Sequence, residues 1–532
     1  MRSHPFASSD GGAFPREFAA HLFRTLPPTL TLVPELAAED EPPPAEFDGS
    51  SWVIRVQLNN GLTWSDGEPI DAFDVEYTFD EAVRLGAADD LGWAVADPNG
   101  PADLLSVTAV DAATVDIRFS GPPGIDRWHF GVATAAILPE HYWLFTFADR
   151  AEGRERDSDL GMTAPSAGGY RLDKATADGG WTWAAVDSWW NAGAEYTVYE
   201  DGTVVYRNSL LGIDKVYGGP AEGPVAAAWV EGPYAGSIRW QPVAKGRSPG
   251  TLVPELADLV DGGQGRNSGT PVPAGAIGFV SRMPTVTSIV FNPSAPALAN
   301  PLTRRAIACL LDPSVAADEI VGAGSVRSGW DSGNGRWHDA APDDPCMAGE
   351  DNRRDIATAL LTEAGWSRGD GAVAPASETN RGLSHRNGLS AMLILVTPGS
   401  AGDPGKAATA LWAEMVLEAA GFEVLILEGD ATLLDVVEWD LAVVAQSTGP
   451  IPRPYLAETI DPAVRHLETG TLAEALAIWA VGRSTITRQA LAMPLYALTT
   501  VDLVRAALTL PYETAVGGLD PAAMATSIRQ TS

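Results

Sequence analysis

The sequence predicts an α/β protein built from two or three domains, and three observations lead to this prediction. The chain has 532 residues, which is too long for a single hydrophobic core. Its composition is 45% hydrophobic and 20% charged, with 54 glycines and 40 prolines, which is typical of a folded protein with many loops. Between residues 392 and 444, two apolar strand-like runs flank an amphipathic helical run, and this β–α–β order is that of an α/β domain.

The most informative segment is 52–84. Residues in its first part alternate between two faces, with Ile54, Val56 and Leu58 on the apolar one, which is the pattern of a half-buried strand. The pair Asn60-Gly61 predicts a tight turn after this strand, because both residues tolerate positive φ.

A second turn and a helix complete this segment. The turn is predicted at Trp64-Ser65-Asp66-Gly67, and Asp71 is the expected N-cap of the helix that follows. The apolar positions of this helix are Phe73, Val75, Tyr77, Phe79 and Val83. The sequence therefore predicts a strand, two turns and a helix in close succession.

Similar signals predict the elements in the rest of the chain. Residues 16–26 are expected to form a helix, followed by an extended segment and by a proline-rich, acidic linker at 39–46. Strands are expected at residues 106–111, 114–119, 288–292, 392–397, 422–427 and 439–444. Helices are expected at residues 301–307, 357–366 and 407–420, the second of them with Gly365 as its C-cap.

The 52–84 segment resembles the signature of family 5 extracellular solute-binding proteins of ABC importers, the family of oligopeptide, dipeptide and nickel receptors. Further segments resemble this family in the same order along the chain. They are 22–26, 33–37, 137–141, 164–172, 288–312, 357–366 and 439–444. The resemblance thus covers about residues 20 to 500.

The resemblance implies a two-lobed, periplasmic-binding-protein-like α/β fold of type II, with three domains and a hinge between the lobes. Domain I is expected to be discontinuous, at 1–47, 186–284 and 487–532. Domain II is expected at 48–185 and domain III at 285–486. The implied function is to capture a small solute between the lobes and to deliver it to the permease subunits of an ABC importer. A peptide is the default solute of the family, and no enzyme activity is expected.

Charge and hydropathy argue against other functions. The net charge of −34 disfavours nucleic-acid binding, because phosphates attract lysine and arginine. No apolar run reaches the roughly 18–20 residues of a membrane span. Residues 1–12 contain no apolar core of a secretory signal, so a signal sequence is not expected within this chain. The resemblance implies an extracytoplasmic monomer at the cell surface or in the periplasm, lipid-anchored or secreted.

Motifs for catalysis and metal binding are weak. Two Gly-x-Ser-x-Gly matches occur, but Ser248 precedes a proline and Ser367 follows a helical run, so neither fits a nucleophile elbow. The seven histidines are scattered and contain no metal-binding pair, so no metal or other cofactor is expected. Cys309 fits a buried small hydrophobic residue, and a disulfide with Cys346 stays open as an alternative.

The residues expected to recognise the ligand differ from those of peptide receptors. In these receptors an aspartate that follows the 439–440 position pairs with the amino group of the peptide. The corresponding residue here is Gly449, and the glutamate of the 22–26 motif corresponds to Arg24. The ligand contacts implied by the resemblance are Arg24, Trp93, Thr287, Ser288, Gln446, Ser447 and Thr448.

Several alternatives stay open at this point. An oligosaccharide could replace the peptide, and the cluster Trp181, Trp183, Trp189 and Trp190 would then be either a stacking wall for the ligand or core filling. A regulatory or scaffolding lipoprotein without a transport role is a further alternative on the same fold. A hydrolase would need a competent nucleophile, which neither serine motif supplies.

Overall fold

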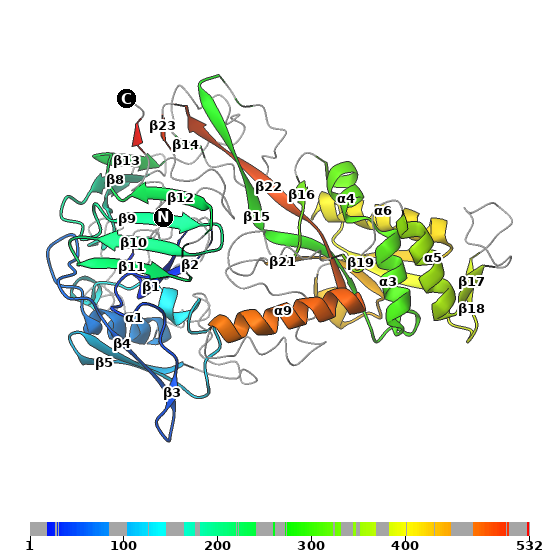
Figure 1. Cartoon of the computed structure of the whole chain (residues 1–532), viewed down its shortest axis with the longest axis horizontal. Coiled ribbons are helices and arrows are strands. Elements are labelled where there is room, and N and C mark those ends of the chain that lie inside the picture. Colours follow the sequence, from blue (N-terminus) through cyan, green and yellow to red (C-terminus); the bar gives the residue numbers. More distant parts are fainter. Residues whose placement is uncertain are drawn as a thin grey trace, which may run out of the picture.

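A computed structural model gives the structure of the chain, and two lobes joined by long strands are its main feature (Figure 1). The structure describes residues 19–26, 29, 31–84, 104–125, 127–144, 164–175, 181–219, 221, 223–240, 259–260, 272, 274–322, 325–330, 344–346, 352–368, 382–400, 402–429, 431–447, 472–506, 508–509 and 529–530. Within these residues, no helix is long and apolar enough to cross a membrane.

The first lobe contains a four-stranded antiparallel sheet covered by a helix. The order in the sheet is β3-β4-β6-β5, and helix α1 packs against β5. These elements are β3 (Glu46–Phe47), β4 (Trp52–Gln57), β5 (Leu104–Asp111), β6 (Thr114–Phe119) and α1 (Ala72–Arg84).

Three smaller sheets complete the first lobe. They have the orders β1-β2, β11-β10-β9-β12 and β13-β8-β7. Their strands are β1 (Phe23–Leu26), β2 (Thr31–Pro34), β7 (Tyr170–Ala175), β8 (Trp181–Ala185), β9 (Glu195–Tyr199), β10 (Val204–Asn208), β11 (Ile213–Tyr217), β12 (Val225–Val230) and β13 (Ser237–Trp240). A short 3-10 helix, η2 (Val132–Thr134), also belongs to this lobe.

The second lobe is built on a mixed seven-stranded sheet of the order β14-β22-β15-β21-β19-β20, with β16 paired to β22. Its strands are β14 (Leu259–Val260), β15 (Ala276–Phe291), β16 (Ser325–Arg327), β19 (Met392–Thr397), β20 (Glu423–Glu428), β21 (Leu441–Ser447) and β22 (Ala492–Arg505). Strand β19 is parallel to both β20 and β21.

Helices cover this sheet. They are α3 (Pro301–Leu310), α5 (Arg353–Ala364), α6 (Pro404–Ala420) and α9 (Leu472–Gln489), with the short η5 (Pro296–Leu298), α4 (Pro313–Val315), η6 (Ala316–Val321) and η8 (Ala431–Asp435). Two small hairpins are formed by β17 (Trp366–Arg368) with β18 (Leu383–His385) and by β23 (Leu508–Thr509) with β24 (Arg529–Gln530).

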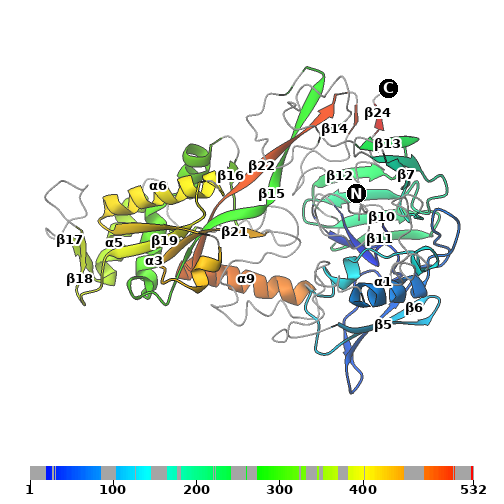
Figure 2. The same ribbon diagram turned by 180° about the vertical axis from the view of Figure 1, so that it is seen from behind.

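Strands β15 and β22 form an antiparallel ribbon that runs from one lobe to the other (Figures 1 and 2). At one end of the ribbon, Phe279 and Val504 belong to a hydrophobic cluster of the first lobe. At the other end, Ile289 and Met493 belong to the main cluster of the second lobe. The ladder between the two strands shifts in register between Arg282 and Val286, so the ribbon is irregular between its two anchored ends.

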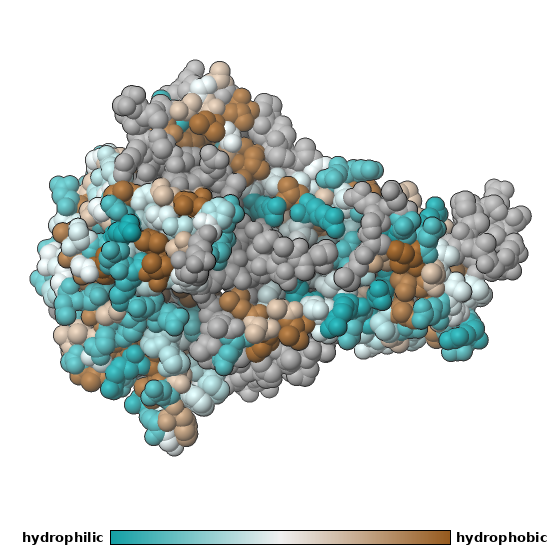
Figure 3. All heavy atoms as spheres, in the orientation of Figure 1, coloured by the Kyte–Doolittle hydropathy of each residue, from teal (hydrophilic) through white to brown (hydrophobic). Residues whose placement is uncertain are grey.

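Helix α9 provides a second connection. Its residues Ala475 and Trp479 share a buried cluster with Ile125, which lies between β6 and η2 of the first lobe. The other side of the helix faces solvent, where Val481 is 65% exposed. Figure 3 shows hydrophobic residues on the surface along α9. The two lobes therefore touch through α9 as well as through the ribbon.

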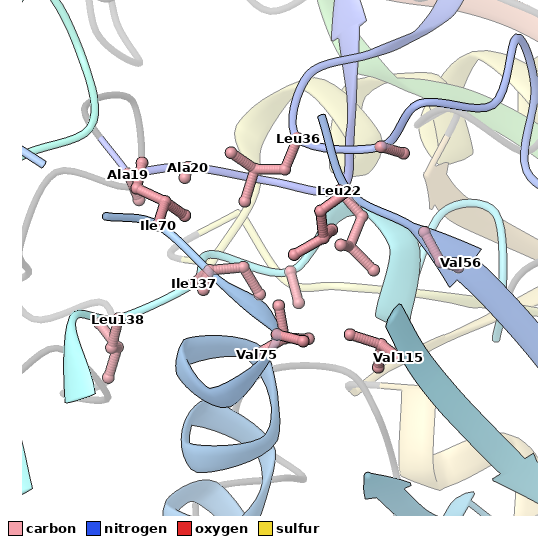
Figure 4. Close-up of a cluster of buried hydrophobic side chains, with 14 of the residues drawn as sticks. Ala19, Ala20, Leu22, Leu36, Val56, Ile70, Val75, Val115, Ile137 and Leu138 are labelled. Atoms are coloured by element: carbon pink, nitrogen blue, oxygen red, sulfur yellow. The ribbon is translucent and has the colours of Figure 1, made fainter. Parts of the chain in front are cut away.

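The burial of residues in β4 confirms the alternation predicted for the first part of the 52–84 segment. Ile54 and Val56 of β4 are fully buried, whereas Arg55 and Gln57 on the opposite face are exposed. Figure 4 shows how Val56 faces Val75 of α1, Leu22 and Val115 across the cluster. The period-2 alternation in the sequence thus reflects a sheet with one buried face.

Asp74 holds the turn, the helix and a distant segment of the first lobe together. Its Oδ2 accepts hydrogen bonds from Trp64 Nε1 at 3.0 Å and from the Asp71 amide at 3.1 Å. Its Oδ1 accepts one from the Glu140 amide at 2.8 Å. Asp71 Oδ1 in turn accepts from the Phe73 amide at 2.9 Å, which confirms Asp71 as the cap of α1. The spacing between the Trp-Ser-Asp-Gly turn and the start of α1 therefore lets Trp64, Asp71 and Asp74 join one hydrogen-bond network.

One predicted helix is wrong. Of the residues expected in a helix at 16–26, Phe23–Leu26 form strand β1, which pairs with β2. Phe23 and Leu26 are buried because both strands pack against the rest of the first lobe. A short apolar run fits a helix and a strand equally well, and this pairing across the chain decides in favour of the strand.

Two details of the helix and cysteine predictions are also settled. Phe73 and Val83 of α1 are 45% and 49% exposed, so the apolar face of this helix is narrower than the sequence suggests. Cys309 and Cys346 form a disulfide that ties the end of α3 to residues 344–346. The other strands and helices predicted at residues 288–444 are confirmed, including the left-handed Gly365 that ends α5.

We predict that the Asp74→Ala substitution lowers the free energy of unfolding by about 3 kcal/mol, because one buried and two partly buried N–H donors lose their acceptor. Urea unfolding followed by tryptophan fluorescence measures this change. The control is Asp80→Ala on the same helix, where the side chain is exposed. Equal unfolding midpoints for the two variants would contradict the role given to Asp74.

The same carboxylate should make stability depend on pH. Burial raises the pKa of Asp74 to about 6, and its three hydrogen bonds only partly oppose this. The folded protein therefore binds one more proton than the unfolded chain between the ordinary pKa and about 6. The contribution of Asp74 is largest below that interval and falls, by on the order of 3 kcal/mol, as the pH rises through 6. Unfolding of wild type and Asp74→Ala between pH 4 and pH 7 should show this loss only in wild type.

Candidate functional site

A cavity of about 540 Å³ lies in the second lobe, where strands β19 and β20 end beside the first half of β21. Strand β19 contributes Val396 and Thr397, β20 contributes Glu428, and β21 contributes residues 442–445. The loop after β19 and the first turn of α6 close another side, and Leu434 of η8 contributes to the wall. The carboxyl ends of parallel strands are a common place for ligand sites in α/β proteins.

Most of the cavity wall is aliphatic. The wall includes Val396, Leu434, Ala442 and Val444, and among the described residues around the cavity there is no aromatic ring. Its polar side chains are Thr397, Lys406 and Glu428. The cavity can therefore receive an apolar group and offers a few polar groups to orient it.

Asp440 holds two of the strands that form the cavity in position. Its Oδ2 accepts a hydrogen bond from the Ile394 amide at 2.8 Å, and its own amide donates to the Ile394 carbonyl at 2.9 Å. These bonds join the start of β21 to the middle of β19. Burial raises the pKa of Asp440, while the bond from Ile394 lowers it. The Trp439-Asp440 motif thus aligns β19 and β21 below the cavity.

The first turn of α6 carries an ion pair beside the cavity. Asp403 is the N-cap of α6, and its Oδ1 accepts a hydrogen bond from the Lys406 amide at 3.0 Å. Its Oδ2 lies 3.0 Å from Lys406 Nζ. Both oxygens of Asp403 are thus used within this turn, and the charge of Lys406 is balanced locally.

Four predicted contact residues lie on the strands next to the cavity. Thr287 of β15 lies opposite Ala445 of β21, a residue of the cavity wall. Gln446 and Ser447 continue β21 beyond Ala445. Thr287 and Ser288 are buried in the sheet, with 6% and 0% of their surface exposed. Thr287 and Ser288 thus lie in the sheet beside the cavity and outside its wall.

Thr287 also belongs to a buried polar chain. It is hydrogen-bonded to Tyr496 of β22, and the Tyr496 hydroxyl lies 3.1 Å from Thr409 Oγ1 of α6. Burial raises the pKa of Tyr496, so the phenol stays protonated and links the sheet to α6. Thr287 therefore supports the strands and the helix beside the cavity. Two further predicted contacts, Trp93 and Thr448, lie outside the described residues.

Arg24 lies in the first lobe within a cluster of acidic and aromatic residues. Its Nη2 donates to Glu231 Oε1 at 3.1 Å, and its Nη1 lies 4.0 Å from Glu35 Oε1. Glu35 Oε2 also lies 2.9 Å from His21 Nδ1. The guanidinium carbon sits 5.1 Å from the centre of the Tyr196 ring. The Arg24 guanidinium thus lies beside two glutamates, Glu231 and Glu35.

Burial and charge act in opposite directions on Arg24. Burial lowers its pKa, but Tyr196, Glu231 and Glu35 together raise it well above the ordinary value. The Tyr196 ring stacks on Tyr206 with a centroid distance of 4.7 Å and on Trp229 at 5.3 Å. Arg24 is therefore a permanent cation held by the packing of the first lobe.

The other candidate motifs have structural positions. Trp183, Trp189 and Trp190 are at most 6% exposed and belong to the clusters of the first lobe, which favours core filling over a stacking wall. Ser367 lies in β17 directly after α5, while Ser248 lies outside the described residues. In the described part of the chain, no three His, Cys, Asp or Glu residues form a group that could hold a metal ion.

Sequence reasoning missed the residues that form the cavity. Lys406, Glu428 and Val396 come from three elements that are distant in the sequence. One local signal was available, because Pro398-Gly399 and Gly429 each follow a predicted strand and mark the ends at which α/β ligand sites form.

Comparisons with known proteins agree with this architecture. Residues 31–207 match the sequence model of the bacterial extracellular solute-binding proteins, family 5 Middle. A search of the curated proteins gives no match. Many solved structures are similar to this chain.

Three of these structures illustrate the similarity. The unliganded open form of the periplasmic murein tripeptide binding protein MppA has a TM-score of 0.65 at 13% identity, over 97% of this chain and 92% of that one. An ABC transporter substrate-binding protein from Sinorhizobium meliloti has a TM-score of 0.65 at 14% identity, over 100% and 98%. NikA from Brucella suis, in complex with Fe(III)-EDTA, has a TM-score of 0.61 at 13% identity, over 100% and 98%.

The sequence match covers one part of the chain, whereas the similarity of fold extends over nearly all of it. The fold is the two-lobed α/β fold of type II binding proteins, as the resemblance implied. Residues 31–207 carry the family's sequence pattern, and the rest of the chain completes the fold of its members. Residues 31–207 are thus similar in sequence to the family 5 extracellular solute-binding proteins, and the fold of the whole chain is that of the solved binding proteins compared above.

Proposed function

We propose that this protein is the substrate-binding component of an ABC import system. It captures a small solute between its lobes and delivers the solute to the permease subunits in the membrane. The observation that carries this proposal is the cavity at the ends of β19 and β20, beside the first half of β21. Its volume of about 540 Å³ lies within the roughly 300–1,000 Å³ of small-molecule sites.

The connection between the lobes supports capture by closure. Each end of the β15–β22 ribbon is anchored in a different core, and its ladder is irregular in between. A ribbon of this kind can bend at the irregular part while both lobes keep their packing. A solute that contacts both lobes stabilises the closed state, so binding and closure are one equilibrium.

The aliphatic wall of the cavity favours a peptide-like solute over an oligosaccharide. Proteins with this fold bind different solutes, since MppA is described as a murein tripeptide binding protein and NikA was solved with Fe(III)-EDTA. Sugars stack on aromatic rings, whereas Val396, Leu434 and Val444 offer aliphatic surface. We therefore propose that the bound solute carries an apolar side chain. The seven predicted contacts and the boundaries of the three domains stay predictions.

The disulfide supports an extracytoplasmic location. Cys309 and Cys346 are both buried and bonded to each other, and such bonds persist mainly outside the reducing cytoplasm. We propose that the protein acts there as a monomer, secreted or attached to the membrane through a lipid anchor.

Mass spectrometry of the solute released from the purified protein tests the function. We expect a small molecule with an apolar group to be released on denaturation, and a thermal shift when that molecule is added back. Absence of any retained or stabilising solute across peptide and sugar panels would contradict a receptor role.

Filling the cavity should block binding. We predict that Ala445→Trp lowers the affinity for the released solute at least tenfold, because the new ring occupies the cavity from an exposed position. Isothermal titration calorimetry measures this change. Ala228→Trp in β12 is the control, since Ala228 is an exposed strand residue of the first lobe. If Ala445→Trp binds the solute as tightly as wild type, the cavity is not part of the binding site.

Replacing Arg24 should show whether this residue stabilises the first lobe or contacts the bound solute. We predict that Arg24→Met lowers the free energy of unfolding by about 3–5 kcal/mol, because it leaves the buried Glu231 without its ion pair. The double variant Arg24→Met/Glu231→Gln should regain part of this loss in urea unfolding. Arg207→Ala is the control, since the pair of Arg207 with Asp214 is exposed. A stable Arg24→Met variant with weaker solute binding would instead make Arg24 a ligand contact.

A further inference from the structure

We propose that the contact between the first lobe and helix α9 is a latch, and that its opening lets the solute enter and leave. The latch consists of Ile125 and Phe130 of the first lobe and of Ala475 and Trp479 of α9. This inference rests on the proposed function, because it names the contact that regulates capture of the solute between the lobes.

The ribbon and α9 meet the first lobe at different places (Figures 1 and 2). In both views the ribbon of β15 and β22 reaches the upper part of the first lobe, near β14, whereas the first turns of α9 reach its lower part, near α1. The ribbon is continuous chain and can only bend, at the irregular part of its ladder. The contact of α9 is non-covalent, so it must break when the lobes rotate apart about the ribbon.

The first-lobe half of the latch is held in place by its own lobe. Ile125 is fully buried, and its carbonyl accepts a hydrogen bond from the Phe130 amide at 2.9 Å. The turn that this bond closes also contains Trp128, which is buried in the core of the first lobe and donates to the Pro43 carbonyl at 2.8 Å. Trp128 therefore fixes the turn to the first lobe, while Ile125 and Phe130 pack in the cluster that contains α9.

Helix α9 reaches the first lobe as a rigid extension of the second lobe. Its 18 residues span about 27 Å. At its far end, the buried Arg304 of α3 donates from Nε to the carbonyls of Gln489 at 3.0 Å and Ala490 at 3.2 Å. The end that meets the first lobe carries Ala475 and Trp479, which are 0% and 2% exposed. A movement of the second lobe is thus transmitted to the latch.

The latch and the cavity share one hydrophobic cluster. Besides Ile125 and Trp479, this cluster contains Val396, Ala442 and Val444, which line the cavity. Protein interiors are close-packed, so a displacement in one part of a cluster changes the packing of the rest. A solute that fills the cavity supports the cluster in which Trp479 packs. Solute binding therefore favours the closed latch, and the closed latch retains the solute.

The chemistry of Trp479 lowers the stability of the closed latch. Its indole N–H is buried and, in the part of the chain that the structure describes, has no hydrogen-bond acceptor. A buried N–H without an acceptor offsets part of the free energy gained by burial of the ring. Opening exposes the N–H to water, which then accepts its hydrogen bond. Small changes in the packing of the latch therefore shift its equilibrium between closed and open.

Small-angle X-ray scattering and hydrogen exchange test the latch in the solute-free protein. We expect Ile125→Ala to increase the radius of gyration and to speed amide exchange at residues 476–482 about tenfold, because α9 loses its contact with the first lobe. Phe130→Ala should have the same effects to a smaller extent. Since Phe130 is only partly buried, this variant keeps the test valid if Ile125→Ala does not fold.

Two control variants separate the latch from general stability. Ile117→Ala removes an equally buried isoleucine from the core of the first lobe, outside the latch. Val481→Ala changes the exposed side of α9. We expect both variants to have the radius of gyration of wild type and its exchange at residues 476–482, although Ile117→Ala should unfold at a lower urea concentration.

The rate of solute dissociation connects the latch to capture. Stopped-flow tryptophan fluorescence measures this rate with the solute that the purified protein releases on denaturation. We expect the solute to dissociate about tenfold faster from Ile125→Ala than from wild type, because an open latch shortens the time that the solute is retained. Dissociation from Val481→Ala should have the rate of wild type.

Three outcomes would overturn the proposal. The first is wild-type scattering and exchange in both Ile125→Ala and Phe130→Ala. The second is the same change in Ile117→Ala, which would assign the effect to a general loss of stability. The third is dissociation from Ile125→Ala at the rate of wild type. If the protein retains no solute, the receptor function fails, but scattering and exchange still decide whether the latch exists, so the two failures are distinguishable.

Discussion

The pairing of β15 with β22 is the constraint on which the rest of the structure depends. Both strands contribute buried side chains to the core of each lobe, so their register fixes which residues belong to which lobe. A shift of one residue would turn Phe279 and Ile289 to the wrong face and open both cores. The irregular part of the ladder lies between these anchors, where a change in twist costs least. The contact of Ile125 with α9 adds a second connection, so any change in the angle between the lobes must also shift this contact.

Buried charge is placed at the junctions between segments in both lobes. Asp74 joins a turn, a helix start and residue Glu140, and Arg24 joins β1 to Glu231 next to β12. Such groups are costly to bury, and each is compensated by several hydrogen bonds or ion pairs. Apolar packing alone would tolerate small displacements of these segments, whereas a hydrogen-bond network does not. The sequence motifs of the family are thus explained in part by geometry that must be kept for the lobes to form.

Local signals predicted much of the fold, whereas contacts between distant segments were beyond them. The alternation in β4, the cap of α1 at Asp71 and the left-handed Gly365 all follow from residues within one element, and all three were predicted. Strand β1 was predicted as a helix because only its pairing with β2 distinguishes the two forms. The cavity brings together Val396, Glu428 and residues 442–445, whose proximity depends on the order of strands in the sheet. The sequence also left open whether Cys309 and Cys346, which are 37 positions apart, are bonded, and the fold shows the disulfide.

The charges of the chain affect which solutes approach the protein and which can bind in the cavity. The chain carries a net charge of −34, so its overall field attracts cations and repels anions before any contact is made. Salt screens this field beyond roughly 10 Å, so selection among solutes must come from groups at the cavity itself. No acidic residue lies between Leu441 and Arg453, the segment that supplies the carboxylate in peptide receptors that the chain resembles. The charged side chains in the cavity wall are Lys406, which is paired with Asp403, and Glu428 at the end of β20. Because the rest of the wall is mainly aliphatic, a solute in this cavity would be selected by burial of apolar surface together with these few charges.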